Sequence, residues 1–216
     1  METKKVLLGP GEGYVEEKKS KFLAVAEPVN TEAQARAVVE RQRKKYHDAR
    51  HHVFAFQVGE HNEIQRYSDD GEPQGTAGMP VLQVILGEGV SNCVIVVTRY
   101  FGGTLLGTGG LVRCYGRAAK EALLDAGVGE VGRFDPISVT VDYAMQGKLS
   151  YEIGQRGLIL EDTVFTDQVE FCLLCRQEET ASLLQALQEM TSGRAKIVQG
   201  QTREGILAEG KIRLLP

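Results

Sequence analysis

The sequence lacks a long apolar run, a clustered set of cysteines and an excess of positive charge, and each absence excludes a class of protein. Without about 20 consecutive apolar residues, the chain offers no candidate for a membrane-spanning helix. Its first residues, METKKVLLGPGEG, lack the apolar segment and the small-residue cleavage site of a signal peptide. We therefore expect a soluble globular protein of the cytoplasm.

The four cysteines do not suggest a metal or redox centre. Only Cys172 and Cys175 are near neighbours, and they fall in an alternating strand pattern where a separation of three residues sends the thiols to opposite faces. Cys93 and Cys114 lie in apolar surroundings. We expect all four to be reduced, mostly buried thiols, and we expect no cofactor.

The charge balance argues against a protein that coats nucleic acid indiscriminately. The chain has 25 basic and 29 acidic residues, a net charge of −4. Residues 1–134 hold 17 of each sign, and the remaining residues carry the whole deficit. Any surface for a polyanion therefore belongs to the first part, where positive charge gathers at Lys18, Lys19 and Lys21, at 41–45, and on a central helix.

Residues 94–127 predict a strand, a glycine turn and a helix in direct succession. The β-branched run 94–97 is typical of a strand buried on both faces, ending near Arg99. Glycines then crowd into nine residues, which indicates unusual backbone angles or close approach. From Leu111 an apolar stripe predicts a helix that ends at Gly127.

This stretch is a candidate anion site. Free amides and a partial positive charge point outward at a helix N-terminus, while Arg113, Arg117 and Lys120 share one helical face. The alternatives are a tight packing turn and an ordinary solvated stripe, and each feature taken alone favours that alternative. The predicted polyanion or RNA-binding set is Arg99, Tyr100, Gly102, Gly103, Gly109, Gly110, Arg113, Arg117 and Lys120.

An acidic cluster offers a second candidate site. Asp69, Asp70 and Glu72 lie in the loop DDGEPQGTAGMP and could hold Mg²⁺, although their spacing does not fit a calcium loop. The alternative is a solvated turn ordered against Arg99. The histidines at 47, 51 and 52 are more typical of structural residues than of metal ligands.

The remaining patterns predict an α+β protein of two domains. Strands are expected at 21–29, 51–58 and 65–68, with helices at 31–46, capped by Thr31 and Gln34, and at 80–86, closed by Gly87. After a boundary near Phe134, the order is β-α-β-β-α-β, the ferredoxin-like unit. We expect domains at 1–134 and 135–203, followed by a loosely held tail at 204–216.

Several motifs together resemble the signature of the IMPACT family. They are DDGEPQGTAGMP at 69–80, the histidine pair at 51 and 52, the aliphatic pairs before Arg99, and RYFGG at 99–103 followed by Leu106 and Gly107. The resemblance implies an N-terminal two-layer α/β domain similar to a ribosomal-protein RNA-binding domain (domain 2). It also implies a C-terminal domain similar to one in elongation factor G.

The resemblance implies a role in translation. Eukaryotic IMPACT members regulate initiation through a protein partner in the amino-acid starvation pathway, and for a bacterial chain RNA or the ribosome is the expected partner. The first hypothesis is therefore a non-enzymatic binding protein linked to translation that contacts RNA, the ribosome or a translation-associated protein. The alternative is a Mg²⁺-dependent hydrolase or phosphotransfer enzyme that uses residues 69–72 beside the glycine turn.

Overall fold

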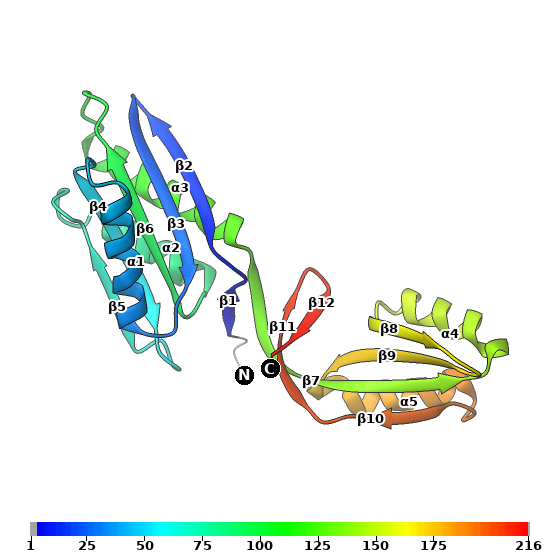
Figure 1. The fold of residues 1–216 in the computed structure, drawn as a ribbon. Helices are drawn as coiled ribbons and strands as arrows, with labels where there is room; N and C mark the ends of the chain where they lie inside the picture. The colour runs from blue at the N-terminus through cyan, green and yellow to red at the C-terminus, as the bar shows by residue number, and fades with distance from the viewer. Residues whose placement is uncertain (1–3, 216) are drawn as a thin grey trace. The chain divides into compact units, whose positions relative to one another are not determined.

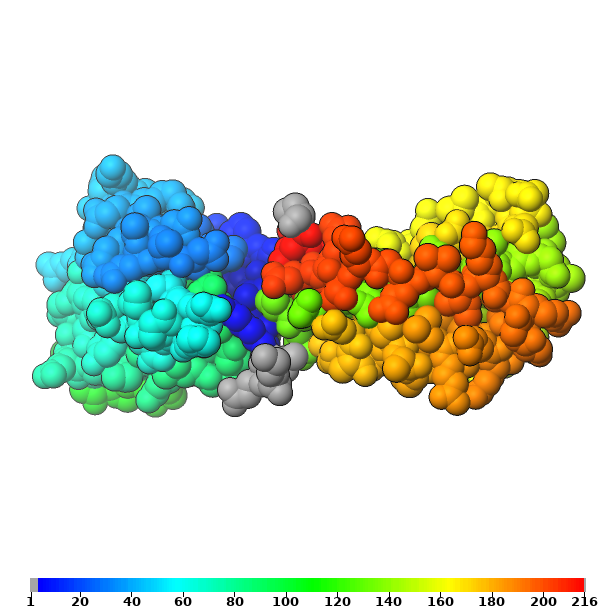
Figure 2. All heavy atoms as spheres, turned by 90° about the horizontal axis from the view of Figure 1, so that it is seen from below, coloured from blue at the N-terminus to red at the C-terminus, as the bar shows by residue number. Residues whose placement is uncertain are grey.

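The computed structural model describes residues 4–215 and divides the chain into two compact units, residues 1–129 and 130–216 (Figure 1). Both mix helices with β-sheet, which confirms the two-domain α+β class. In the space-filling view, the first unit carries the colours from blue to green and the second those from light green to red (Figure 2). Within residues 4–215, no helix is both long and apolar enough to cross a membrane.

The first unit is built on a five-stranded antiparallel sheet in the order β2-β3-β6-β4-β5. Its elements are β1 (Lys5–Leu7), β2 (Gly11–Glu17), β3 (Ser20–Pro28), α1 (Glu32–Lys45), β4 (His51–Val58), β5 (Ile64–Ser68), α2 (Gly78–Glu88), β6 (Cys93–Tyr100) and α3 (Gly107–Ala126). The central strand β6 is buried at every position except Tyr100, as its β-branched run predicts.

Helices cover both faces of this sheet, whereas the resemblance implied two layers. Val94 and Val96 of β6 face α1, while Ile95 and Val97 face α2 and α3. Figure 1 shows α1 on the near face of the sheet and the other two helices behind it. Alternate residues of one strand point to opposite faces, so a strand that is apolar throughout needs both faces covered.

Two helix boundaries test the sequence patterns directly. The predicted cap of α1 is confirmed, because the Gln34 amide N–H donates to Thr31 Oγ1 over 3.2 Å. The start of α3 is wrong by four residues: Gly107 to Gly110 form its first turn instead of belonging to the preceding turn. Poor helix formers are tolerated there because the preceding strand and the packed remainder of α3 fix the helix axis.

The second unit has the ferredoxin-like order. Its elements are β7 (Val128–Val141), α4 (Tyr143–Gln155), β8 (Ile159–Phe165), β9 (Val169–Arg176), the 3₁₀ turn Gln177–Glu179, α5 (Thr180–Thr191), β10 (Lys196–Gln199), β11 (Arg203–Ala208) and β12 (Lys211–Leu214). The antiparallel pairs give β10-β7-β9-β8, and both helices pack their apolar stripes on one face of this sheet. The thiols of Cys172 and Cys175 fall on opposite faces, as expected from their spacing.

The predicted boundary and tail both require correction. The structure divides the chain between Gly129 and Glu130, inside the strand β7, so the predicted boundary near Phe134 lies a few residues too late. Residues 203–214 form the hairpin β11–β12 rather than a loose tail, and β11 pairs with Glu130 to Phe134 while β10 pairs with Ile137 to Thr140. One edge of the 14-residue strand β7 thus pairs first with β11 and then, further along, with β10.

Candidate functional site

Arg99, the first residue of the predicted anion-binding set, is buried in the interior of the first unit. Its Nη1 donates to Glu72 Oε1 over 2.6 Å, and its Nη2 donates to Ser20 Oγ over 3.3 Å. The side chains of Arg99 and Glu72 are only 6% and 5% exposed. The prediction that Arg99 meets a polyanion directly is therefore corrected: its charge is already neutralised by a buried carboxylate.

The same carboxylate binds the central helix. Tyr115 of α3 donates its hydroxyl to Glu72 Oε1 over 2.8 Å, and burial, followed by the nearby Glu72 charge, raises the pKa of Tyr115. Phe22 packs edge-on against the Tyr115 ring, with 5.0 Å between centroids. The signature residues Glu72 and Arg99, together with Tyr115, thus join the acidic loop, β6 and α3 into one core.

The other two acidic residues are also occupied. Asp69 Oδ1 accepts from the Gly78 and Ala77 amides over 2.8 and 3.1 Å, and its Oδ2 accepts from Gly75, so this side chain anchors the start of α2. Asp70 accepts from the His52 amide over 2.6 Å and from Arg43 over 3.2 Å.

These contacts correct the metal interpretation of the acidic loop. The carboxylates of Asp69, Asp70 and Glu72 each turn to a different set of protein donors. Within residues 4–215, no group of three His, Cys, Asp or Glu side chains is arranged to hold a metal ion.

Tyr100 points to the opposite face of the sheet from Arg99. Its hydroxyl donates to Asp48 Oδ1 over 2.6 Å, and this hydrogen bond, with a smaller contribution from burial, raises the pKa of Tyr100 to about 12. The same bond lowers the pKa of Asp48. Tyr100 is therefore a tether between β6 and the loop after α1.

The glycine turn packs against the hairpin that joins β2 to β3. A Cβ on Gly102 would lie 2.1 Å from the carbonyl carbon of Lys19, so only glycine fits, and the Gly102 amide donates to Ser20 Oγ over 3.1 Å. Gly103 has a φ of +84°, as expected for this turn. Gly109 and Gly110 have neither a positive φ nor a contact with another backbone segment, so their predicted special role is not supported.

The hairpin held by Gly102 has an unusual turn. Lys18 and Lys19 link the paired residues Glu17 and Ser20, and both lysines adopt left-handed backbone angles, with φ of +46° and +65°. Asn-Gly normally occupies such two-residue turns, because left-handed angles cost other residues about 1–2 kcal/mol each. Two ammonium groups are thus presented at a conformational cost.

Of the three basic residues on α3, only Arg113 is free of a carboxylate partner among residues 4–215. Arg117 pairs with Glu121 over 3.2 Å, and Lys120 pairs with Glu88 of α2. The Arg113 guanidinium reaches back along the helix, with Nη1 3.7 Å from the position of a Cβ on Gly109. Arg113, near the start of α3, therefore remains a candidate anion-binding residue. Arg117 and Lys120 are already paired with carboxylates of the protein.

These observations define a surface that we call the basic edge. It consists of the turn Lys18–Lys19 and the loop 101–106, together with Lys21 on the α1 side of the sheet and Arg113 on the α3 side. The hairpin turn and this loop lie together at the upper end of the first unit in Figure 1. Within the loop, Phe101 is 46% exposed and Leu105 is 82% exposed. Leu106 provides no side-chain cap for α3, so amides of the first turn remain available at this edge.

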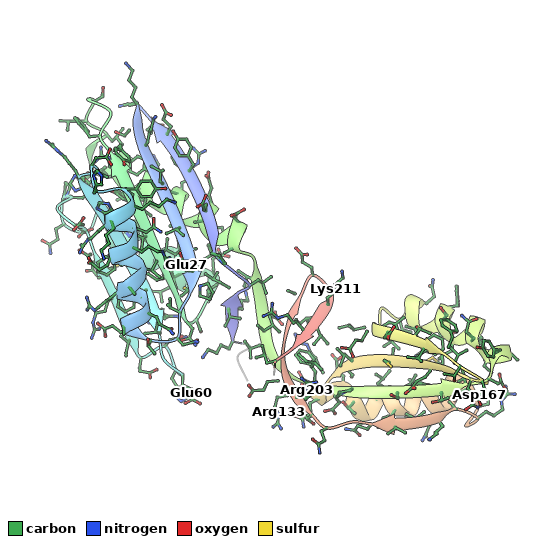
Figure 3. The ribbon with its side chains drawn as sticks, in the orientation of Figure 1. Glu27, Glu60, Arg133, Asp167, Arg203 and Lys211 are labelled. Carbon is green, nitrogen blue, oxygen red and sulfur yellow. The ribbon has the colours of Figure 1, made fainter. Side chains whose placement is uncertain are left out.

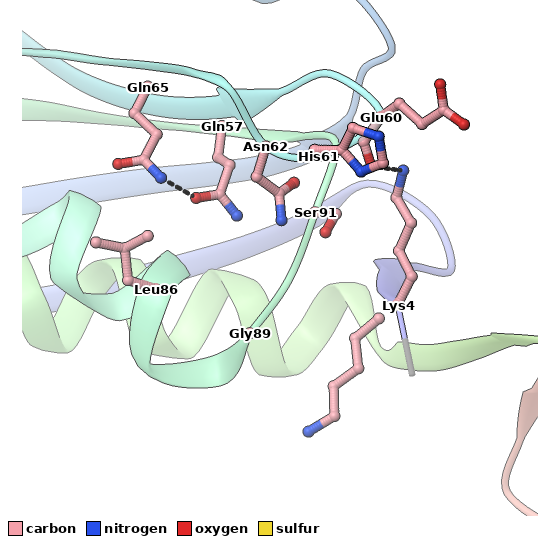
Figure 4. A pocket seen from close by; sticks show the side chains of 10 residues that line it. Lys4, Gln57, Glu60, His61, Asn62, Gln65, Leu86, Gly89 and Ser91 are labelled. Carbon is pink, nitrogen blue, oxygen red and sulfur yellow. Dashed lines mark hydrogen bonds between the residues drawn. The ribbon is translucent and has the colours of Figure 1, made fainter. Parts of the chain in front are cut away.

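Another cavity of the first unit lies away from the basic edge and has the features of a solvated surface hollow. It measures about 820 Å³ between β4, β5 and the end of α2. Its polar groups bond to one another: Gln65 Nε2 donates to Gln57 Oε1 over 2.8 Å, and Lys4 Nζ donates to the Glu60 carbonyl over 3.4 Å (Figure 4). We assign it no role.

Sequence reasoning noted the lysines at 18, 19 and 21 but did not join them to the glycine turn. The reason is that it placed no strand at residues 11–17. Two inward positions of that strand are Gly11 and Gly13, which pack against the α3 backbone and hide the apolar alternation. The available signal was the charged run EEKKSK between two alternating segments.

Comparison with known proteins agrees with the signature. Residues 18–123 match the Impact N-terminal domain, and residues 139–194 match a domain of unknown function, DUF1949. The chain is 35% identical over 191 residues to the IMPACT family member YvyE of Bacillus subtilis, covering 88% of each protein. It is 46% identical over 108 residues to the IMPACT family member YigZ of Escherichia coli, covering 49% of this chain and 53% of that protein.

A solved structure supports the same assignment across both units. The crystal structure of a hypothetical protein with 30% sequence identity aligns with a TM-score of 0.58 and covers 93% of this chain and 98% of its own. The chain belongs to the IMPACT family.

Proposed function

We propose that this protein is a non-enzymatic RNA-binding protein that acts in translation or its regulation. In this proposal, the basic edge contacts the phosphate backbone. The observation that carries it is the Lys18–Lys19 turn, in which two lysines occupy left-handed positions against the backbone of Gly102. Strained backbone tends to occur at functional sites. The conformational cost of the Lys18–Lys19 turn therefore favours a functional role for the two lysine charges.

The surroundings of the turn suit a phosphate chain. Lys18, Lys19, Lys21 and Arg113 have no carboxylate within ion-pair distance among the described residues. Amides of the first turn of α3 add a partial positive charge. Phe101 offers an exposed ring on which a base can stack.

The hydrogen bonds of the acidic loop argue against the enzymatic alternative. A Mg²⁺-dependent hydrolase would need Asp69, Asp70 and Glu72 to converge on one ion, and each instead accepts hydrogen bonds from backbone or side-chain donors of the fold. The link to translation is supported by the family signature, whose eukaryotic members regulate initiation.

A capture experiment with a matched control tests the proposal. The tagged full chain, the Lys19→Ala, Arg113→Ala double variant and an Arg36→Ala, Arg66→Ala control are incubated with bacterial lysate, with and without ribonuclease. We expect the wild type and the control to capture RNA and the double variant to lose most of it. Capture of proteins alone, unchanged by ribonuclease, would replace RNA with a protein partner.

Salt dependence gives the quantitative form of this test. For a single-stranded oligonucleotide, each phosphate contact contributes about 0.7 to the slope of log affinity against log salt. Loss of Lys19 and Arg113 should therefore reduce the slope by about 1.4. An unchanged slope in this variant would place the contact elsewhere.

A further inference from the structure

A groove runs along the α1 side of the first-unit sheet, over strands that α1 leaves uncovered. The helix packs on β4 and β6, so the neighbouring face of β2 and β3 is open. Two adjoining cavities of about 280 and 560 Å³ share the lining residues Glu12, Val25, Gln42 and Lys45. The groove is thus one continuous feature between α1 and the β2–β3 hairpin.

Gln42 is the distinctive residue of this groove. It is only 7% exposed and lines both cavities, yet its side-chain amide has no hydrogen-bond partner among the residues of the structure, 4–215. The amide atoms of Gln42 are not among the enclosed, unsatisfied polar atoms of the described residues, so they reach the groove, where water or a ligand can complete their hydrogen bonds. The groove therefore contains an unused donor and an unused acceptor side by side.

The lining around Gln42 suits a planar, uncharged group. Tyr14, 50% exposed, and Tyr46 border the smaller cavity and can contact an aromatic ring, while Leu23 and Val25 provide an apolar floor. Charge does not favour a phosphate inside: the lining contains the cations Arg41 and Lys45 and the carboxylates of Glu12, Glu27 and Asp125. Arg41 is further neutralised by its pair with Glu27, which is labelled in Figure 3.

We infer that this groove binds a base of single-stranded RNA, with adenine preferred, through the Gln42 amide. Adenine presents an acceptor at N7 beside a donor at N6, which complements the donor and acceptor of a glutamine amide. The inference rests on the proposed RNA-binding function and specifies how the sequence is read.

The groove and the basic edge can share one strand. Leu23 on the groove floor pairs with Tyr14, and Lys21, two residues earlier on the same face of β3, points from the same side. Lys21 is therefore about 7 Å further along the hairpin, toward the Lys18–Lys19 turn. A base seated at Gln42 leaves its flanking phosphates directed toward these lysines.

Fluorescence anisotropy with labelled oligo(A) and oligo(U) of eight nucleotides tests the inference on the full chain. We expect the wild type to prefer oligo(A). Gln42→Leu should weaken oligo(A) binding about 5- to 150-fold, the effect of losing a bidentate base contact, and leave oligo(U) unchanged. Gln185→Leu, the same change on the surface of α5, serves as the control.

Tyr14→Ala provides a second variant at an exposed position, for use if Gln42→Leu melts at a lower temperature. We expect it to weaken both oligonucleotides, because stacking does not distinguish bases. Equal wild-type affinity for the two oligonucleotides, or an unchanged preference in Gln42→Leu, would overturn base recognition while leaving the proposed function intact. Absence of binding to either oligonucleotide would reject both.

Discussion

Glu72 shows how one side chain of the family signature can serve the fold. It accepts hydrogen bonds from Arg99 and Tyr115 in a setting where all three are nearly enclosed. The sequence predicts two alternatives for the acidic loop, a metal site and a turn ordered against Arg99. It could not decide between that pairing and a metal site, because spacing along a loop does not fix the direction of a carboxylate.

The buried pair makes a stability prediction. Glu72→Gln removes the counter-charge of Arg99 and should lower the free energy of unfolding by about 3–5 kcal/mol. Glu88→Gln breaks the pair with Lys120, in which both side chains are more than one-third exposed, and should cost less than about 1 kcal/mol. Urea denaturation measures both. Equal losses would show that burial of Arg99 is not what makes its pair important.

Tyr100 makes a prediction about pH. Its hydrogen bond to Asp48 favours the protonated phenol and raises the pKa of Tyr100 to about 12. The resulting stabilisation is fully present below the unfolded pKa, about 10, and is lost as pH rises from there through about 12. Titration by ¹³C NMR should show Tyr100 of Asp48→Asn ionising near pH 10. A pKa that stays near 12 in this variant would assign the shift to another cause.

At the scale of elements, two glycines distinguish the effect of backbone packing on the free energy of unfolding from the effect of helix propensity. Gly102→Ala would force the Lys19 backbone to move and should lower the free energy of unfolding by about 1–3 kcal/mol. Gly109→Ala, in the first turn of α3 with no backbone nearby, should raise it by up to about 1 kcal/mol. Thermal and urea unfolding distinguish the two. A loss of stability at Gly109 would restore the original view of a single glycine turn.

Sequence periodicity succeeded where a whole element carried a single pattern. The strand β6, the cap of α1 at Thr31 and the β-α-β-β-α-β order all match the predictions from the sequence. It failed at short or glycine-containing strands: β2 was missed, and the hairpin β11–β12 was assigned to a tail. The available sequence signal for that hairpin was Gly210 between two alternating segments. In the structure, Glu209 and Gly210 adopt left-handed angles at the turn.

At the scale of the whole molecule, the division between the units can be tested with fragments. Residues 130–216 retain the segment of β7 that pairs with β11, so this fragment should melt cooperatively. A fragment that starts at residue 135 loses that segment and leaves β11 paired only with β12, so it should melt at a lower temperature. Calorimetry gives both values. Equal melting temperatures would mean that β11–β12 contributes little to this unit.

The candidate site could be predicted only in part because it is assembled from distant segments. Arg113 and the glycine loop were identified from the central stretch alone. The lysine turn lies some eighty residues earlier and is joined to the loop by the contact between Gly102 and Lys19, which no local pattern contains. Conversely, Arg99 looked exposed at the end of a strand because its buried partner Glu72 lies in another loop.

The most direct test of the account replaces the Lys18–Lys19 turn with the residues that its backbone favours. Lys18→Asn with Lys19→Gly should raise the free energy of unfolding by about 2–4 kcal/mol, because strain is relieved at both positions of the turn. The same protein should bind a single-stranded oligonucleotide more weakly, with a salt slope shallower by about 1.4. Unfolding in urea and anisotropy across a salt series measure the two effects, with Arg36→Ala, Arg66→Ala as the charge-matched control. Greater stability with undiminished binding would contradict the assignment of the basic edge.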